Sequence, residues 1–223
     1  MTTLQDEVTI PAGRVKLDGN LIVPDDAQGV VLFVHGSGSS RHSPRNRFVA
    51  QTLNHAGLAT LLFDLLTPEE ESVDIHTREH RFDIGLLAER LGFATDWILQ
   101  EPAGRGLRIG YFGSSTGGGA ALVAAATRPD DVSAVVSRGG RPDLAGAALG
   151  KVRAPTLLIV GGDDDVVIGM NREAMAQMRC EVRLELIPGA THLFEEPGTL
   201  ESVAQLASEW FSEHLRSNPE RAS

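Results

Sequence analysis

LRIGYFGSSTGGG, residues 107–119, is the stretch of sequence that decides the fold. An apolar run, Leu107 to Tyr111, leads directly into the GxSxG pattern of residues 113–117, and an alanine-rich segment follows. A serine at a sharp turn between a strand and a helix has a strained backbone, and the residues two positions away on either side must be small. We therefore predict a strand, a turn and a helix that begins near Thr116, with Ser115 presented as a nucleophile.

Short apolar runs recur on both sides of this stretch. Continuous apolar strands are buried on both faces, which is typical of a parallel sheet covered by helices. The runs cover 30–34, 59–63, 107–111, 132–136, 156–160 and 182–187. The segments between and after them predict helices over 47–56, 81–99, 116–126, 171–178 and 200–215. The sequence thus predicts an α/β fold with a mostly parallel central sheet of about eight strands and helices on both faces.

The N-terminal part and two connecting segments have other patterns. Polar and apolar residues alternate in 7–10 and 14–23, which predicts two or three antiparallel edge strands. Pro11-Ala12-Gly13 would join them, and Asp18-Gly19-Asn20 would break the second. We interpret the acidic segment Leu66 to His80 as a loop or a small cover near the site. One domain is expected over residues 1–216, followed by a disordered tail over 217–223.

Composition and charge exclude several classes of function. The chain has 223 residues, of which 42% are hydrophobic and 22% charged, as in a soluble globular domain. A formal net charge of −10 disfavours nucleic acid and anionic membrane surfaces as partners. The single cysteine, Cys180, excludes an internal disulfide and a multi-cysteine metal site. Neither a signal peptide nor a membrane span is readable, so we predict a cytoplasmic protein.

A serine nucleophile needs a base to take its proton and an acid to orient that base. An acidic cluster, Asp163-Asp164-Asp165, directly follows the apolar run 156–160, and His192 follows the last run. Both segments are expected at the carboxyl edge of the sheet, where open α/β sheets keep their sites. The order serine, aspartate, histidine is that of α/β-hydrolases. His192 is therefore the predicted base, and the acid is one of the three aspartates.

Hydrolysis through a serine also needs donors for the negatively charged oxygen of the tetrahedral intermediate. The glycine-containing loop His35-Gly36-Ser37-Gly38 follows a central apolar run, and its glycines permit a backbone N–H to turn toward the nucleophile. We predict the backbone N–H groups of Ser37 and Thr116 as the two donors. His35 is expected to support this loop rather than take part in the chemistry.

On these motifs the chain resembles the α/β-hydrolases, and within them the small dienelactone hydrolase-like enzymes with little or no inserted cap. The resemblance covers nearly the whole chain. Its residues are HGSGSS at 35–40, GSSTG at 113–117, APTLLIVGGDDDVV at 154–167 and GATHLFEEPG at 189–198. Aligning Gly161 with the glycine of the family's GxxD pattern implies Asp164 as the acid, with Asp163 and Asp165 as the alternatives. Dienelactone hydrolases proper carry a cysteine where this chain has Ser115, so dienelactone itself is not the expected substrate.

Arginines gather near the predicted strand ends on the same edge. We predict Arg41, Arg138 and Arg141 as candidates to bind a substrate carboxylate, since a guanidinium binds a carboxylate through two parallel hydrogen bonds. Solvated loop charges are the alternative interpretation. Two further arginines, Arg45 and Arg47, lie in the same region.

His76-Thr77-Arg78-Glu79-His80 matches HxxEH, a zinc peptidase motif that needs both histidines on one firm helix. We interpret the match as coincidental, because the segment is polar and follows an acidic run. No metal and no organic cofactor are predicted.

The sequence therefore predicts a serine hydrolase that cleaves small carboxylic esters or lactones through an acyl-enzyme intermediate. Acyl transfer or perhydrolysis with the same residues is the first alternative, and a noncatalytic ligand-binding protein of the same fold is the second. The expected partner is a small-molecule ester or lactone, without nucleic acid or membrane. The oligomeric state stays open, with a homodimer as one option.

Overall fold

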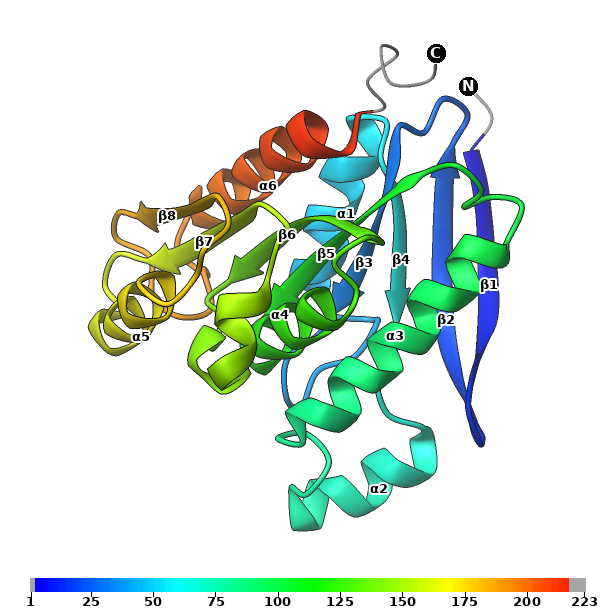
Figure 1. Cartoon of the computed structure of the whole chain (residues 1–223), viewed down its shortest axis with the longest axis horizontal. Helices are drawn as coiled ribbons and strands as arrows, with labels where there is room; N and C mark the ends of the chain where they lie inside the picture. Colours follow the sequence, from blue (N-terminus) through cyan, green and yellow to red (C-terminus); the bar gives the residue numbers. More distant parts are fainter. Residues whose placement is uncertain (1–2, 217–223) are drawn as a thin grey trace.

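A single eight-stranded sheet forms the centre of the protein, as the computed structural model of residues 3–216 describes it (Figure 1). Its strand order is β1-β2-β4-β3-β5-β6-β7-β8. Strands β3 to β8 run parallel to one another, and β2 is antiparallel to both of its neighbours. The mostly parallel sheet predicted from the apolar runs is thus confirmed. The strands are β1 (Thr3–Ala12), β2 (Val15–Pro24), β3 (Gly29–Val34), β4 (Ala59–Phe63), β5 (Arg108–Ser114), β6 (Val132–Arg138), β7 (Thr156–Gly161) and β8 (Val182–Ile187).

Helices cover both faces of the sheet (Figure 1). Successive residues of a strand point to opposite faces, so Leu32 packs in one apolar cluster with α3 and α4, and Phe33 packs in another with α1 and α6. Both clusters are continuous and deeply buried, which holds the strand ends rigidly in place. The helices are α1 (Pro44–His55), α2 (Pro68–Thr77), α3 (Ile84–Gln100), α4 (Thr116–Thr127), the 3-10 segment η1 (Pro142–Lys151), α5 (Asp165–Met175) and α6 (Thr199–Leu215).

The antiparallel pair at the N-terminus differs from the prediction in one respect. Strand β2 continues through Asp18-Gly19-Asn20 without a break, because β1 pairs with it on one side and β4 on the other. Gly19 lies opposite Phe63, and a Cβ atom at position 19 would lie 3.1 Å from Val8. The glycine therefore permits close packing inside the sheet rather than a turn. The turn itself follows Ala12, where Gly13 has a φ of 67°.

The acidic segment after β4 is a helix, α2, and not a loop. Thr67 caps it: its hydroxyl accepts the Glu70 N–H at 3.2 Å, and the Glu70 carboxylate accepts the Thr67 N–H at 2.9 Å. Such a reciprocal pair, with Pro68 in the first turn, satisfies donors that would otherwise be orphaned. Helix α2 lies beyond the edge at which β4 ends, away from the two layers of helices (Figure 1).

Other helices also differ from the expected ranges: α1 begins three residues before the predicted start at 47, and α3 begins three residues after the predicted start at 81. Helix α5 begins at Asp165, six residues before the predicted start, since Asp164 takes the position that caps it. The 3-10 segment η1 lies in a connection for which no helix was predicted. The predicted tail, 217–223, lies outside the described residues, and the single-domain organisation and the cytoplasmic location stay predictions. Within residues 3–216, every helix is too short or too polar to cross a bilayer.

Candidate active site

Ser115 occupies the turn between β5 and α4 with a strained backbone. Its φ is 50° and its ψ is −122°, a region that residues other than glycine rarely occupy. The turn is held on one side by the Ser115 N–H, which donates to the Arg138 carbonyl at 3.2 Å. Strain of this kind costs on the order of 1–3 kcal/mol and persists only where the surroundings enforce it. The backbone at Ser115 is therefore fixed by its neighbours, as expected for a presented nucleophile.

The glycines of the GSSTG turn are required by close backbone contacts. A Cβ atom at Gly117 would lie 2.1 Å from the Val34 carbonyl oxygen, and one at Gly113 would lie 2.5 Å from the Gly117 carbonyl oxygen. Gly36 approaches from the other side, where a Cβ atom would lie 3.1 Å from that of Ser115. The turn and the loop after β3 are thus packed directly against each other.

His192 and Asp164 are hydrogen-bonded across two loops. The Nδ1 atom of His192 lies 2.8 Å from Oδ2 of Asp164, which stands in the turn after β7, directly before the first residue of α5. Of the three consecutive aspartates, Asp164 is the one that makes this contact with His192 in the structure. An imidazole whose Nδ1 is held by a carboxylate has its Nε2 available to accept a proton.

The His192 loop lies beside the residues that hold the serine turn. A Cβ atom at Gly139, the residue after Arg138, would lie 3.1 Å from the His192 carbonyl oxygen and 3.6 Å from its Cε1. The loop is fixed by Glu196, which accepts hydrogen bonds from the N–H and the hydroxyl of Thr191 at 3.2 and 2.6 Å. The hydroxyl bond lowers the pKa of Glu196 and keeps it charged. The structure thus brings the loops of Ser115, Asp164 and His192 to one edge of the sheet.

The backbone N–H of Ser37 is not free in this structure. It donates to the hydroxyl oxygen of Thr116 at 3.0 Å, which ties the loop after β3 to the first residue of α4. His35 lies beneath the loop: its Nδ1 is 3.0 Å from the Gly36 carbonyl oxygen, and its Nε2 accepts the Leu65 N–H at 3.0 Å. Burial lowers the pKa of His35, so the ring is neutral at pH 7.

Two of the three predicted arginines are paired with carboxylates. Arg41 contacts Asp64 through both its backbone N–H and its guanidinium. Arg141 forms two parallel hydrogen bonds, at 2.9 and 2.7 Å, with Asp143. Neither guanidinium is poised for a substrate, because each already has a carboxylate partner.

Arg138 is different. Its side chain is buried at the end of β6, with the guanidinium 5.9 Å from the centre of the Phe194 ring. The Nε and Nη1 atoms have no hydrogen-bond partner within residues 3–216. Burial, together with the positive charge of Arg45, lowers the pKa of Arg138 to about 10. Unpaired N–H groups of a buried cation are costly, and an anion would satisfy them.

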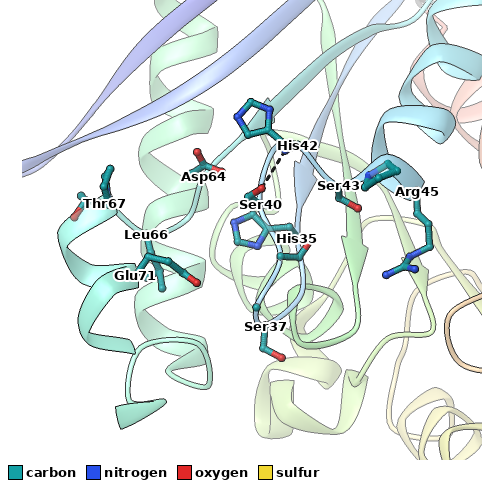
Figure 2. A pocket seen from close by; sticks show the side chains of 14 residues that line it. His35, Ser37, Ser40, His42, Ser43, Arg45, Asp64, Leu66, Thr67 and Glu71 are labelled. Atoms are coloured by element: carbon teal, nitrogen blue, oxygen red, sulfur yellow. Dashed lines mark hydrogen bonds between the residues drawn. The ribbon is translucent and has the colours of Figure 1, made fainter. Parts of the chain in front are cut away.

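A cavity of about 600 Å³ opens beside Ser37, between the loop after β3, the start of α1 and helix α2 (Figure 2). Most of the residues that line it have polar side chains, and Glu71 and Arg45 lie at well-separated positions. The segment 66–80, expected to be a loop or a small cover near the site, contributes part of this wall as helix α2, and the helix itself was not predicted. The Thr67–Glu70 capping pattern, which begins four positions after the end of β4, is the signal that identifies the helix.

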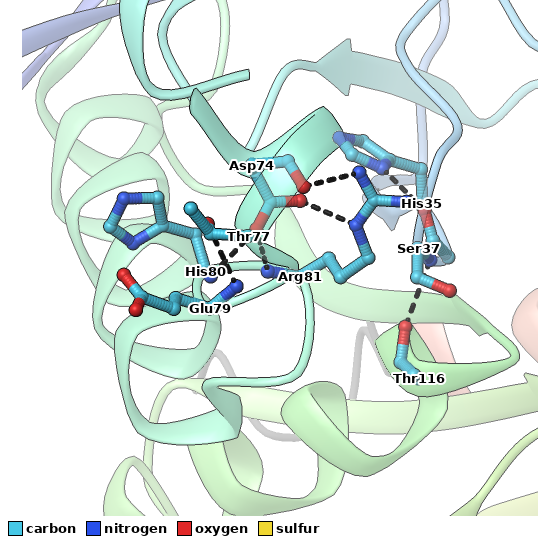
Figure 3. Close-up of polar contacts among 9 residues, drawn as sticks. His35, Ser37, Asp74, Thr77, Glu79, His80, Arg81 and Thr116 are labelled. Atoms are coloured by element: carbon cyan, nitrogen blue, oxygen red, sulfur yellow. Dashed lines mark hydrogen bonds and ion pairs between the residues drawn. The ribbon is translucent and has the colours of Figure 1, made fainter. Parts of the chain in front are cut away.

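The HxxEH segment is not a continuous helix. Helix α2 ends at Thr77, and Arg78 is left-handed with a φ of 60°, so His76 and His80 do not share one helical face. The chain turns there around Asp74, which accepts hydrogen bonds from the backbone N–H groups of His80 and Arg81 and from the Arg81 side chain (Figure 3). Within the described residues, no group of three or more potential ligands has the arrangement of a metal site.

Comparison with known proteins identifies the family. A family model for the alpha/beta hydrolase fold matches residues 29–149, more than half of the chain. The crystal structure of a dienelactone hydrolase from Anabaena variabilis is 64% identical, with a TM-score of 0.94 over 96% of this chain and 99% of that one. Est1E from Butyrivibrio proteoclasticus shares the fold at 19% identity, with a TM-score of 0.76 over 93% of this chain and 98% of its own.

Two curated proteins from Mycobacterium tuberculosis strains are 60% identical over 210 residues, which is 94% of this chain. Both carry the provisional name phosphoribosyl transferase, and the chain spans only 46% of their length. The family match and the structural similarity cover the sheet, the serine turn and the loops described above. The chain therefore belongs to the α/β-hydrolases and, within them, to the dienelactone hydrolase-like family.

Proposed function

We propose that this protein is a serine hydrolase that cleaves small carboxylic esters or lactones through an acyl-enzyme intermediate. The observation that carries the proposal is the hydrogen bond of 2.8 Å between His192 and Asp164, on loops beside a strained Ser115 turn. A hydroxyl is a weak nucleophile at neutral pH and becomes reactive when an oriented imidazole takes its proton. No metal or organic cofactor has a part in this proposal.

The reaction proceeds in two steps, acylation of the serine and deacylation by water. Ser115 Oγ attacks the carbonyl carbon while its proton passes to Nε2 of His192, and the carbon–oxygen bond of the ester then breaks as the alcohol takes that proton. Water next attacks the acyl-enzyme by the same route, which releases the carboxylic acid and restores the serine. Asp164 holds the ring with Nδ1 protonated and stabilises the imidazolium that forms transiently.

The tetrahedral intermediates carry a negative charge on the former carbonyl oxygen. We assign its stabilisation to the backbone N–H groups of Ser37 and Thr116, which belong to adjoining segments joined by the Ser37–Thr116 hydrogen bond. Loss of one such donor costs roughly 3 kcal/mol of activation free energy. Thr116 is also the first residue of α4, so the positive end of the helix dipole adds to the stabilisation.

We further propose that the preferred substrate carries an anionic group, and that Arg138 binds it. Two nitrogens of Arg138 are buried without a partner in residues 3–216, whereas Arg45, which lines the cavity beside Ser37, already donates from Nη1 to Glu195 at 3.1 Å. The positive charge of Arg45 disfavours the charged form of Arg138, and a substrate anion bound to Arg138 would offset this repulsion. Arg41 and Arg141 are not part of this proposal, because aspartates already neutralise them.

The curated relatives are named for a transferase activity, but this chain spans only 46% of their length, so that activity is not carried over to it. The decisive experiment is a hydrolysis screen over 4-nitrophenyl esters of increasing acyl length, with simple lactones added and Ser115→Ala as the control. We expect activity on short acyl chains that Ser115→Ala abolishes. Activity that grows steadily with chain length would contradict the small-substrate assignment. A well-folded, inactive protein would favour the noncatalytic ligand-binding role, and product ratios with added alcohol or peroxide would reveal acyl transfer or perhydrolysis.

A further inference from the structure

The peptide group between Gly36 and Ser37 is held at both ends by side chains (Figure 3). Its carbonyl oxygen accepts from Nδ1 of His35 at 3.0 Å and from the Ser39 N–H at 3.2 Å. Its N–H donates to the Thr116 hydroxyl oxygen at 3.0 Å. The proposed function uses this N–H to stabilise the oxyanion, so its orientation matters for the rate and not only for the fold.

His35 sets the direction of that peptide group. The Leu65 N–H donates to Nε2, so the proton of the neutral ring sits on Nδ1 and points at the Gly36 carbonyl. Hydrogen bonds in a chain polarise one another, so the bond to the carbonyl strengthens the N–H at the other end of the same peptide. His35 is in this sense a positioning residue for the N–H of Ser37.

The Thr116 hydroxyl accepts one hydrogen bond and still has a proton to donate. A hydroxyl can donate once while it accepts, and within residues 3–216 the Thr116 hydroxyl has no acceptor of its own. The side chain is buried, directly after Ser115 and against the loop of Ser37. The oxyanion of the tetrahedral intermediate forms next to this hydroxyl. It is therefore the candidate acceptor for the unused proton of Thr116.

We infer that the Thr116 hydroxyl is a third donor to the oxyanion and, in the resting enzyme, the acceptor that keeps the Ser37 N–H aimed. This inference rests on the proposed serine hydrolysis. When the carbonyl oxygen becomes charged, it accepts from both groups, because a hydrogen bond to an ionised oxygen is about twice as strong as one between neutral groups. The hydroxyl then contributes more in the transition state than in the substrate complex, so it raises kcat rather than lowering KM.

The test compares Thr116→Val, which keeps the branched shape and removes the hydroxyl, with Thr116→Ser, which keeps the hydroxyl. For a short 4-nitrophenyl ester, we expect Thr116→Val to lower kcat by at least about tenfold and to change KM by less than about twofold. Thr116→Ser should stay within about threefold of the wild type. A boronic acid that forms a tetrahedral adduct with Ser115 should lose affinity for Thr116→Val in parallel with kcat.

Two controls keep the outcomes distinct. Thermal unfolding shows whether each variant is folded. A purely structural change would raise KM as well as lower kcat, whereas loss of a direct contact to the oxyanion lowers kcat and the affinity for the boronic acid together and leaves KM nearly unchanged. If the wild type hydrolyses esters and Thr116→Val keeps at least half of its kcat, or Thr116→Ser loses as much as Thr116→Val, the inference is wrong and the proposed function stands. If the wild type is inactive toward every ester and lactone, both are wrong.

Discussion

Nδ1 of His192 lies 2.8 Å from Oδ2 of Asp164, although the two residues stand 28 positions apart in the chain. Parallel strands β7 and β8 lie side by side, so the turn after the first and the loop after the second meet at one edge of the sheet. Strand β7 is buried along its whole length, which leaves the pair little freedom to separate.

This pairing predicts which aspartate matters for the rate. Asp164→Asn should lower kcat/KM for a short ester by about 10³- to 10⁴-fold, because the amide can stabilise the wrong tautomer of His192 and cannot stabilise its cation. The neighbouring variants Asp163→Asn and Asp165→Asn should stay within about twofold, as surface changes do. Steady-state kinetics of the three variants checks this, and a larger loss in either neighbour would contradict the assignment.

Packing at the serine turn predicts a sharp contrast between two glycines. Gly117→Ala places a methyl group 2.1 Å from the Val34 carbonyl oxygen, so it should destabilise the fold by about 3 kcal/mol or more. Gly169 lies inside α5 with open space around the same position, and Gly169→Ala should stabilise by about 0.5–1 kcal/mol. Urea unfolding of both variants measures the difference. Equal stability of Gly117→Ala and wild type would mean that the loop after β3 does not pack against the turn.

The buried ring of His35 predicts a loss of stability in mild acid. Burial lowers its pKa below the ordinary 6.5, although the Gly36 carbonyl and the charges of Asp64 and Glu71 raise it in part. The unfolded chain therefore takes up a proton near pH 6.5 that the folded protein does not. The free energy of unfolding should fall as the pH drops through 6.5, by up to about 1.4 kcal/mol per pH unit for this group.

Urea unfolding at pH 7.5, 6.5 and 5.5 measures this dependence. His35→Asn removes the titrating group and should flatten it, whereas His55→Asn, at an exposed position at the end of α1, should leave it unchanged. A slope that persists in His35→Asn would show that another group is responsible. Asp74 acts in a separate window: burial raises its pKa, but the hydrogen bonds from Arg81 and His80 outweigh this and lower it, so its contribution is lost only below about pH 3.8.

The unpaired guanidinium of Arg138 predicts a preference for anionic esters. Arg138→Met should lower kcat/KM for the 4-nitrophenyl monoester of succinic acid by at least about tenfold, because a hydrogen bond to a charged group contributes about 1.5–3 kcal/mol. The neutral 4-nitrophenyl butyrate should change by less than about threefold. Arg141→Met, whose partner is Asp143, is the matched control and should not discriminate between the two. Equal losses on both esters would argue for a structural role of Arg138.

The order of strands and helices could be predicted from the sequence, because a strand is recognised from the residues of a short segment alone. Strands β4 and β8 occupy the ranges predicted for them: β4 is a short apolar run that is buried throughout, and β8 alternates apolar with charged residues at the edge of the sheet. Gly19 led to the wrong prediction of a break in the second strand. The chain stays extended there because strands β1 and β4 pair with it on both sides, which the local sequence does not show. Helix α2 was not predicted because its first turn is acidic and resembles a polar loop. Acidic residues are in fact favourable at the N-terminus of a helix.

The candidate site also has a part that the sequence predicts and a part that only the structure shows. Ser115 and His192 are identified by motif and position, but the geometry of a single contact distinguishes Asp164 from its neighbours. Which arginine lacks a carboxylate is not a local property. Arg41 is paired with a residue 23 positions away, and two guanidinium nitrogens of Arg138 have no partner among residues 3–216. Contacts between distant segments have no signature in a single sequence.

The most direct test of the account is covalent labelling with a fluorophosphonate, followed by intact-protein mass spectrometry and mapping of the modified peptide. The account predicts one adduct per chain, on Ser115, with none in Ser115→Ala and much slower labelling in His192→Ala, because the imidazole activates the hydroxyl. A folded wild-type protein that takes no label, or one that is labelled elsewhere while Ser115→Ala still hydrolyses esters, would contradict it.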